Sequence, residues 1–108
     1  MNKNITPRNE KGQPDGYWEY YFPNGKLGYK GNYINGEYDG LWEYYYTNGK
    51  LHYKGNYING NGNQDGPWEW YYDNGKLSNK GKYVNGERNG LWEEYYDNAN
   101  LSSKKYYM

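Results

Sequence analysis

Few side chains of this chain could carry out catalysis, and most of them recur at one fixed position of a repeating pattern. Each copy of the pattern has a glutamate directly after its tryptophan, at Glu19, Glu43, Glu69 or Glu93, and the only histidine is His52. Retaining glycosidases need two carboxylates about 5 Å apart. The glutamates of successive hairpins would lie about 10 Å apart, and each would face a lysine. His52 has no nucleophile beside it in a base-activated arrangement. The sequence therefore predicts no catalytic residues and a protein that is not an enzyme.

The sequence also contains one segment that imitates a metal loop. The run from Asn61 to Gly66 resembles the start of a calcium loop, but the position of the bidentate glutamate is taken by Tyr72. Cysteine is absent, so the chain has neither a disulfide nor a thiolate ligand. We therefore expect a plain turn at this segment, with no bound metal and no cofactor.

The pattern that organises the chain is a run of Trp, Glu and aromatic residues, an Asn-Gly turn, and a second run that ends in Lys, Gly and Asn. Its tryptophans are spaced 24, 26 and 24 residues apart, at Trp18, Trp42, Trp68 and Trp92. The turn glycines Gly25, Gly49 and Gly75 keep the same register. A fixed period of this length is typical of stacked supersecondary units, and such arrays mostly bind other molecules.

Each copy is predicted to form a β-hairpin. The dipeptide Asn-Gly between two aromatic runs favours a two-residue type I′ turn, which fixes the pairing of the strands. In the second copy Thr47 then faces Lys50 and Tyr46 faces Leu51. Further along the hairpin the Glu of every copy faces a Lys, and the Trp of the first three copies faces a Gly. A tryptophan opposite a glycine is expected to cover the bare backbone. Alternation of side chains predicts an aromatic face that includes Leu51 and a polar face that includes His52.

The hairpins are predicted to join through Gly-x-x-Asp-Gly return turns into a single-layer antiparallel meander of about eight strands, an all-β fold. The approximate repeat boundaries are residues 12–35, 36–61, 62–85 and 86–108, preceded by a loosely held segment at 1–11. The third link has two additional residues and should form a longer loop. The fourth copy departs from the pattern at Glu94, at Ala99 in place of the turn glycine, and at Lys105 in place of the glycine opposite Trp92.

Composition limits the kind of partner. The 108 residues carry 13 basic and 13 acidic side chains, so the formal net charge is zero, which argues against a protein that tracks nucleic-acid phosphates or anchors to a membrane through basic residues. Tyrosine and tryptophan supply the apolar area, because aromatic residues make up 22% of the chain. No apolar stretch is long enough to span a membrane or to resemble a signal peptide, and we expect a cytoplasmic protein.

Two segments, Gly40 to Leu51 and then Gly55 to Gly60, resemble the variant MORN repeat. The resemblance extends from residue 12 to about 107. In bacteria, strings of this variant resemble the YwqK family, which is described as antitoxin or immunity proteins. The resemblance implies a protein that binds a toxin or effector, whereas other MORN-repeat proteins act as scaffolds, dimerisation modules or lipid-associated platforms.

A single sheet cannot bury both of its faces, so the aromatic rows must be closed by curling, covered by a second copy or left open for a partner. We expect the tryptophans to form an internal spine. The residues expected to contact a partner protein are Tyr21, Tyr45, His52, Tyr71 and Tyr95, because tyrosine is frequent at interaction hot spots. The favoured function is an immunity or inhibitor protein, including one from a phage or mobile element.

Two other functions fit the same residues. Regular aromatic rows could bind carbohydrate or a cell-wall ligand, and an aromatic face could meet itself in a homodimeric scaffold. The terminal strands at 17–22 and 101–107 could also pair with strands of a partner.

Overall fold

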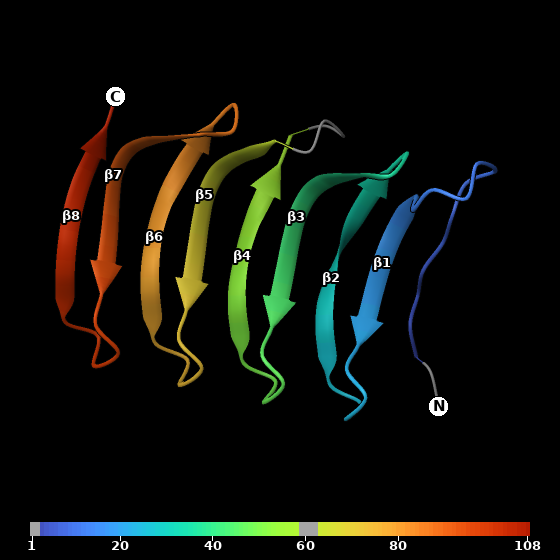
Figure 1. Ribbon diagram of the computed structural model, residues 1–108, viewed down its shortest axis with the longest axis horizontal. Helices are drawn as coiled ribbons and strands as arrows, with labels where there is room; N and C mark the ends of the chain where they lie inside the picture. The colour runs from blue at the N-terminus through green and yellow to red at the C-terminus, as the bar shows by residue number, and fades with distance from the viewer. Residues whose placement is uncertain (1–2, 59–62) are drawn as a thin grey trace.

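The computed structural model describes residues 3–58 and 63–108, which form one antiparallel sheet. Its eight strands are hydrogen-bonded to one another in chain order (Figure 1). They are β1 (Gly16–Tyr21), β2 (Leu27–Ile34), β3 (Glu37–Tyr45), β4 (Leu51–Tyr57), β5 (Gln64–Tyr71), β6 (Leu77–Val84), β7 (Glu87–Tyr95) and β8 (Leu101–Tyr107). The predicted all-β meander of four hairpins is therefore confirmed.

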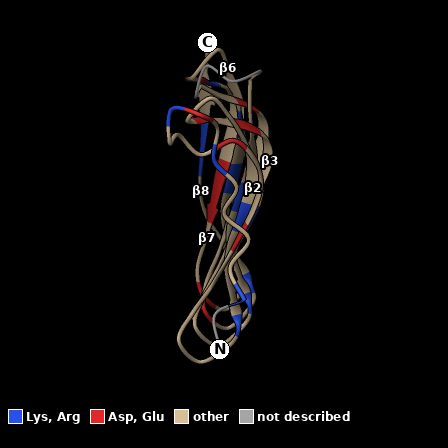
Figure 2. Ribbon diagram, turned by 90° about the vertical axis from the view of Figure 1, so that its right-hand side faces the viewer, with Lys and Arg blue, Asp and Glu red and all other residues tan. Residues whose placement is uncertain are grey.

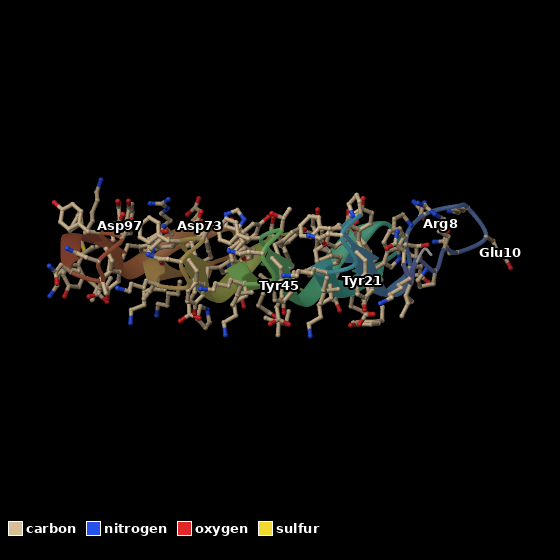
Figure 3. All side chains as sticks on the ribbon, turned by 90° about the horizontal axis from the view of Figure 1, so that it is seen from below. Arg8, Glu10, Tyr21, Tyr45, Asp73 and Asp97 are labelled. Atoms are coloured by element: carbon tan, nitrogen blue, oxygen red, sulfur yellow. The ribbon has the colours of Figure 1, made fainter. Side chains whose placement is uncertain are left out.

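The sheet is a single layer. Its principal extents are 45 × 34 × 12 Å, and the view along its edge shows no second layer of described residues on either side (Figure 2). Side chains project from both sides of this layer (Figure 3). Both faces of the sheet are consequently open to solvent over most of their area.

The predicted pairing within hairpins is correct away from the turns. Trp42 opposes Gly55, Glu43 opposes Lys54 and Tyr44 opposes Tyr53. The equivalent Trp–Gly and Glu–Lys pairs recur in the first and third hairpins, and Glu93 opposes Lys104 in the fourth. The repeated register follows from turns of equal length in all four hairpins.

The predicted geometry of the hairpin turns is wrong. The Tyr46 amide donates to the Lys50 carbonyl at 2.8 Å, and the Gly49 amide donates to the Tyr46 carbonyl at 2.9 Å. Of the Asn-Gly pair only the glycine has a positive φ, at 89°. The loop therefore has three residues, a type I turn followed by a left-handed glycine, so Thr47 does not face Lys50 and Tyr46 does not face Leu51.

This turn shifts the strands by one residue next to it. Tyr45 opposes Leu51 while Tyr44 opposes Tyr53, which leaves His52 as an additional residue in a β-bulge. Directly opposed residues share a face, so Leu51 lies on the side of Tyr45. The predicted faces of Leu51 and His52 are both wrong, because strict alternation fails at a bulge.

Type I′ turns occur in the links between hairpins instead. Asn35 and Gly36 have φ of 48° and 87°, and Asn85 and Gly86 have φ of 51° and 85°. Each pair connects directly opposed strand residues, as a two-residue loop requires. The longer third link was predicted at residues that include 59–62, which lie outside the described residues.

The Gly-x-x-Asp-Gly segments are therefore not return turns over their whole length. Their second glycines lie inside strands, where the register shifts and φ is positive: Gly40 at 69°, Gly66 at 70° and Gly90 at 71°. Nor does the aspartate of the first segment bond its own turn. Asp15 Oδ1 accepts a hydrogen bond from the Asn35 amide at 2.9 Å, so it holds the turn of the next link.

The core of this thin sheet is a row of tryptophans. Each lies on a glycine of the preceding hairpin, and not on the glycine that it opposes in its own hairpin as we expected. A Cβ atom at Gly31 would fall within the ring of Trp42, whose Nε1 donates to the Asn32 carbonyl at 2.9 Å. The same relationship joins Trp68 to Gly55 and Trp92 to Gly81. The exposed fractions of Trp42 and Trp68 are only 1% and 2%, so the tryptophans form the buried spine between hairpins.

Trp18 has no preceding hairpin to lie on, and the N-terminal segment takes that place. Its Nε1 donates to the Pro7 carbonyl at 2.8 Å, and the Arg8 guanidinium lies 5.2 Å from the centre of its ring. Ile5 and Glu19 exchange two backbone hydrogen bonds of 2.9 Å. The described part of the segment that was expected to be loosely held thus runs along β1 and covers Trp18.

The hairpin turns are also linked to one another along one edge of the sheet, the lower edge in Figure 1. Asn24 Nδ2 donates to the Thr47 carbonyl at 2.9 Å, and Asn48 Nδ2 donates to the Asp73 carbonyl at 2.9 Å. Lys26 Nζ donates to the Asn48 carbonyl at 3.2 Å. The turns therefore hold the hairpins at a constant spacing.

Candidate functional site

One face of the sheet carries the Glu–Lys rows and most of the tyrosines that we expected to contact a partner. We call it the charged face and define it by Glu43, Lys54, Glu69 and Lys80, which oppose one another across β3 to β6. The opposite side, which carries the tryptophan spine, is called the aromatic face.

Tyr21 and Tyr71 stand on the charged face and bond the glutamate of their own strand. Tyr21 Oη donates to Glu19 Oε1 at 2.8 Å, and Tyr71 Oη donates to Glu69 Oε1 at 2.9 Å. A hydrogen bond to an ionised carboxylate favours the neutral phenol. That bond raises the pKa of Tyr21, and burial followed by the bond to Glu69 raises the pKa of Tyr71 to about 12.

Glu19 also accepts a bond of 2.6 Å from Tyr17 Oη, so two phenols flank one carboxylate. These two bonds lower the pKa of Glu19. The two bonds therefore favour an ionised Glu19 between neutral phenols.

Tyr45 and Tyr95 occupy the equivalent positions in the second and fourth hairpins. Burial, followed by the nearby charge of Glu43, raises the pKa of Tyr45. The carbonyl of Tyr95 accepts a hydrogen bond from Tyr72 Oη of the preceding hairpin. Both side chains are half-buried.

The ion pairs on the charged face connect successive hairpins. Lys30 Nζ lies 3.5 Å from Glu43 Oε1, and Lys54 Nζ lies 3.6 Å from Glu69 Oε1. Lys80 and Glu93 repeat this contact at 3.9 Å. Such half-exposed pairs contribute at most about 1 kcal/mol each, so they serve register and solubility more than stability.

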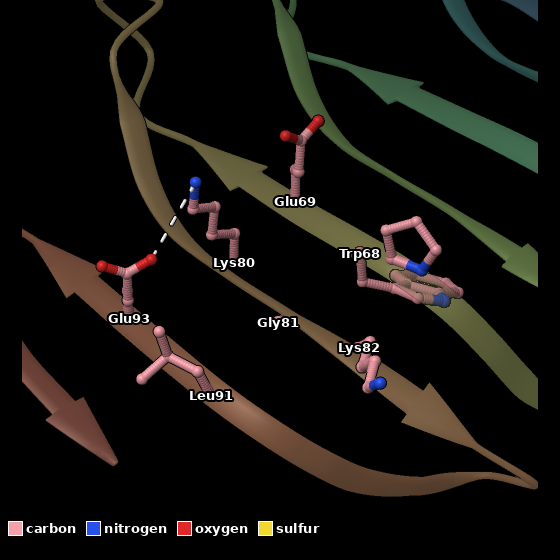
Figure 4. A pocket seen from close by; sticks show the side chains of 8 residues that line it. Trp68, Glu69, Lys80, Gly81, Lys82, Leu91 and Glu93 are labelled. Carbon is pink, nitrogen blue, oxygen red and sulfur yellow. Dashed lines mark ion pairs between the residues drawn. The ribbon is translucent and has the colours of Figure 1, made fainter. Parts of the chain in front are cut away.

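Beside these ion pairs the charged face is hollowed across β3 to β7. One hollow, of about 330 Å³, is lined by Pro67, Glu69, Lys80 and Leu91 among others (Figure 4). A second, of about 350 Å³, lies between Leu41 and Pro67 and shares Glu69 with the first. Together they form a shallow trough, with the row Leu41, Pro67 and Leu91 as its apolar wall and the glutamates as the other wall.

The apolar wall was missed from the sequence. Its residues precede the tryptophan of each repeat, where Tyr17 stands in the first copy. Leu41 is 56% exposed and Leu91 is 36% exposed. The signal that could have revealed the row is the recurrence of an apolar residue at a position that strand alternation places on the polar face.

His52 does not stand with the tyrosines of the charged face. Its ring stacks on Tyr46 with centroids 4.1 Å apart and meets Tyr53 edge-on at 5.1 Å. Burial lowers its pKa, which keeps the imidazole neutral. The bulge thus separates His52 from the four tyrosines with which we grouped it and places it against the aromatic face.

On the aromatic face the tyrosines stack mainly on one another. Tyr44 and Tyr53 have ring centroids 4.5 Å apart with planes at 14°, and Tyr38 and Tyr57 are 4.6 Å apart with planes at 19°. Rings stacked in this way turn their edges and hydroxyls outward. Stacking of sugar rings needs exposed aromatic faces, so this arrangement does not favour the carbohydrate ligand that the aromatic rows suggested.

The described residues contain no group of three or more His, Cys, Asp or Glu side chains that could hold a metal ion. The calcium-like segment was predicted to start at Asn61, outside the described residues, and its Asp65 opposes Asn56 in the sheet. The described part of the chain includes no helix long and apolar enough to cross a membrane.

Comparison with protein families gives one result. The family model of the MORN repeat variant matches residues 14–35, 38–59, 64–85 and 88–108, one segment for each hairpin. These segments cover most of the chain and reproduce the period read from the tryptophans. A comparison with curated proteins returned no match.

Proposed function

Because the chain belongs to the family of MORN repeat variants, we propose that it is a non-enzymatic module that binds another protein and blocks it sterically, as an immunity or inhibitor protein does. The resemblance to the YwqK family supports the immunity role. A compact inhibitor carried by a phage or mobile element would need the same properties.

The observation that carries the proposal is the trough on the charged face, together with the tyrosine row beside it. No described residue covers this face, and it combines apolar wall residues with hydrogen-bonding phenols and charges of both signs. Interfaces between proteins share this mixture of apolar contacts and satisfied polar groups. The balanced net charge favours a protein over a polyanion as the partner.

The size of the sheet fits a blocking role. A face of 45 × 34 Å is larger than the about 800 Å² that each partner buries in a typical stable complex. The tryptophan spine buries its rings between successive hairpins without a second layer, so one whole face stays free to cover an active site or a docking surface of the partner. Binding alone would then inhibit, and no chemistry by this chain is required.

A tagged pull-down from the native host tests the proposal, with mass determination of the eluted complex. We expect one protein at fixed stoichiometry, and we expect its activity to fall when this chain is added. Recovery of the chain alone, or as a homo-oligomer, would overturn the proposal and favour the scaffold function.

Variants locate the interface in the central hairpins. Tyr45→Ala combined with Tyr71→Ala should weaken binding of the captured protein at least about tenfold. The matched control is Tyr96→Ala, which removes a tyrosine that is 56% exposed beside the turn of the fourth hairpin, away from the trough. Unchanged binding by the double variant, with a thermal unfolding temperature like that of the parent, would contradict this placement.

A further inference from the structure

The trough has a regular period along the sheet. Its apolar wall takes one residue from every second strand, Leu41 from β3, Pro67 from β5 and Leu91 from β7. Adjacent strands are about 4.8 Å apart, so the wall residues recur about every 9.6 Å. A ligand that contacts all of them must present side chains at the same interval.

Polypeptide conformations differ in how well they meet this interval. A polyproline II segment advances about 3.1 Å per residue and returns to the same side after three residues, about 9.3 Å. A β-strand repeats its side after two residues, about 6.7 Å, and an α-helix returns nearly to one face after seven residues, about 10.5 Å. Over the two intervals of the wall only the polyproline II segment stays within about 1 Å of register.

The polar groups of the trough fit the same kind of ligand. Its central lining includes the side chains of Lys54, Asn56, Lys80 and Lys82, which offer hydrogen-bond donors. A proline-rich segment has carbonyl acceptors and few amide donors, so donors are what its backbone needs. Two of these four donors, Lys54 and Lys80, also form ion pairs with glutamates of the next hairpin.

Lys82 gives the trough a direction. Among the described residues it makes no ion pair, and the equivalent positions in the first two hairpins are Asn32 and Asn56. The Lys82 ammonium therefore stands as the one unmatched cation of this lining, on β6 between the wall residues Pro67 of β5 and Leu91 of β7. A carboxylate on the ligand between its second and third apolar residues would complement it.

We propose that the trough binds a polyproline II segment of the partner protein, with an apolar residue at every third position and a carboxylate between the two apolar residues that flank Lys82. The inference rests on the proposed function, because it names the part of the protein partner that the charged face holds. A segment of seven residues would reach across the trough, since three apolar contacts span two intervals.

Synthetic peptides test the period directly on the full chain. The probe is Leu-Pro-Pro-Leu-Pro-Glu-Leu-Pro-Pro, whose glutamate stands between the second and third leucine, and the control has the same composition with its leucines out of the three-residue period. We expect the probe to bind with a Kd below about 1 mM and the control to bind at least about tenfold more weakly. Equal binding of the two peptides, or no binding of the probe, would overturn the proposal.

Surface variants place the peptide in the trough. Leu91→Asp should weaken binding of the probe at least about tenfold, whereas Ile34→Asp, at a residue 41% exposed on β2 and outside the trough, should leave it unchanged. Lys82→Glu should remove the preference for the glutamate-bearing probe over the same peptide without glutamate. Equal losses in Leu91→Asp and Ile34→Asp would contradict binding in the trough.

The two proposals fail in different ways. If the captured partner protein binds and is weakened by Tyr45→Ala with Tyr71→Ala, but the probe neither binds nor competes with it, the polyproline II inference is wrong and the proposed function stands. Competition between the probe and the captured protein, lost in Leu91→Asp, would support both.

Discussion

Trp42 lies on Gly31 of the preceding hairpin, although the residue that it opposes in its own hairpin is Gly55. The ring thus fills the space that a side chain at position 31 would need, and its Nε1 bonds the next carbonyl of the same strand. Glu43 likewise pairs with Lys30 across the same boundary. Contacts within a hairpin set the register, and contacts between hairpins build the core.

Substitution of the covered glycines should be severely destabilising. Gly55→Ala places a Cβ within the ring of Trp68, and the ring can move only by leaving its buried site. We expect a loss of about 1–3 kcal/mol or more in the free energy of unfolding, measured by urea denaturation with tryptophan fluorescence. The matched control is Lys105→Ala, at the same position of the fourth hairpin. No described tryptophan lies on this residue, and the change removes only the contact of Lys105 Nζ with the Tyr107 ring, 5.2 Å from its centre, so it should stay within about 1 kcal/mol. A similar loss in both variants would contradict this account.

Ala99→Gly should stabilise the protein. Ala99 holds the left-handed turn position with φ of 76°, which costs a residue with a Cβ about 1–2 kcal/mol. We expect the free energy of unfolding, measured by urea denaturation, to rise by about 1 kcal/mol. Gly75→Ala at the equivalent turn should give a loss of similar size, and a gain in that variant would show that φ does not decide the effect.

The hydroxyl of Tyr46 links the second hairpin to the third, because it donates to the Tyr71 carbonyl at 2.6 Å. Tyr46→Phe should therefore cost about 1 kcal/mol. Phe22 occupies the same position in the first hairpin, so Phe22→Tyr should gain stability of up to about the same size. Tyr96→Phe is the control, since Tyr96 is 56% exposed on the last hairpin. If Tyr96→Phe costs as much as Tyr46→Phe, the bond between hairpins is not the cause.

Alkaline pH should destabilise the fold between pH 10.0 and about 12. Burial and neighbouring tyrosines raise the pKa of Tyr57 from 10.0 to about 12, and burial with the Glu69 bond does the same for Tyr71. The unfolded chain releases these protons at lower pH than the folded chain, so stability is complete below pH 10.0 and is lost as pH rises towards 12. Urea denaturation across this range should show a shallower pH dependence for Tyr71→Phe. An unchanged dependence in both Tyr71→Phe and Tyr57→Phe would refute the assignment.

The sequence was sufficient for the sheet, its strand order and the pairing away from the turns. The pairing was inferred from a two-residue turn that is wrong, but the bulge next to the three-residue loop restores the same register from Tyr44 and Tyr53 onward. The sequence was not sufficient for the turns, since the same dipeptide forms a type I′ turn at Asn35–Gly36 and a type I turn with a left-handed glycine at Asn48–Gly49. The residue before the dipeptide carried the missing signal. Pro23 in the first hairpin suits the second position of a type I turn and Gly25 the fourth.

The candidate site was predicted only in part. Tyr21, Tyr45 and Tyr71 occupy the charged face as alternation requires, but His52 does not, because the bulge next to the turn reverses its side. The trough depends on contacts between hairpins, which no pattern within one repeat describes. For the same reason the sequence indicated a tryptophan spine without revealing which glycine each ring covers.

The contacts of the tryptophans also set the order in which hairpins can join the sheet. The glycine that each ring covers always comes from the preceding hairpin, as Trp42, Trp68 and Trp92 show, and never from a hairpin that follows. Synthesis on the ribosome delivers the hairpins in that order. Every newly emerged hairpin therefore finds its docking strand already made, and growth of the sheet can follow translation without waiting for the C-terminus.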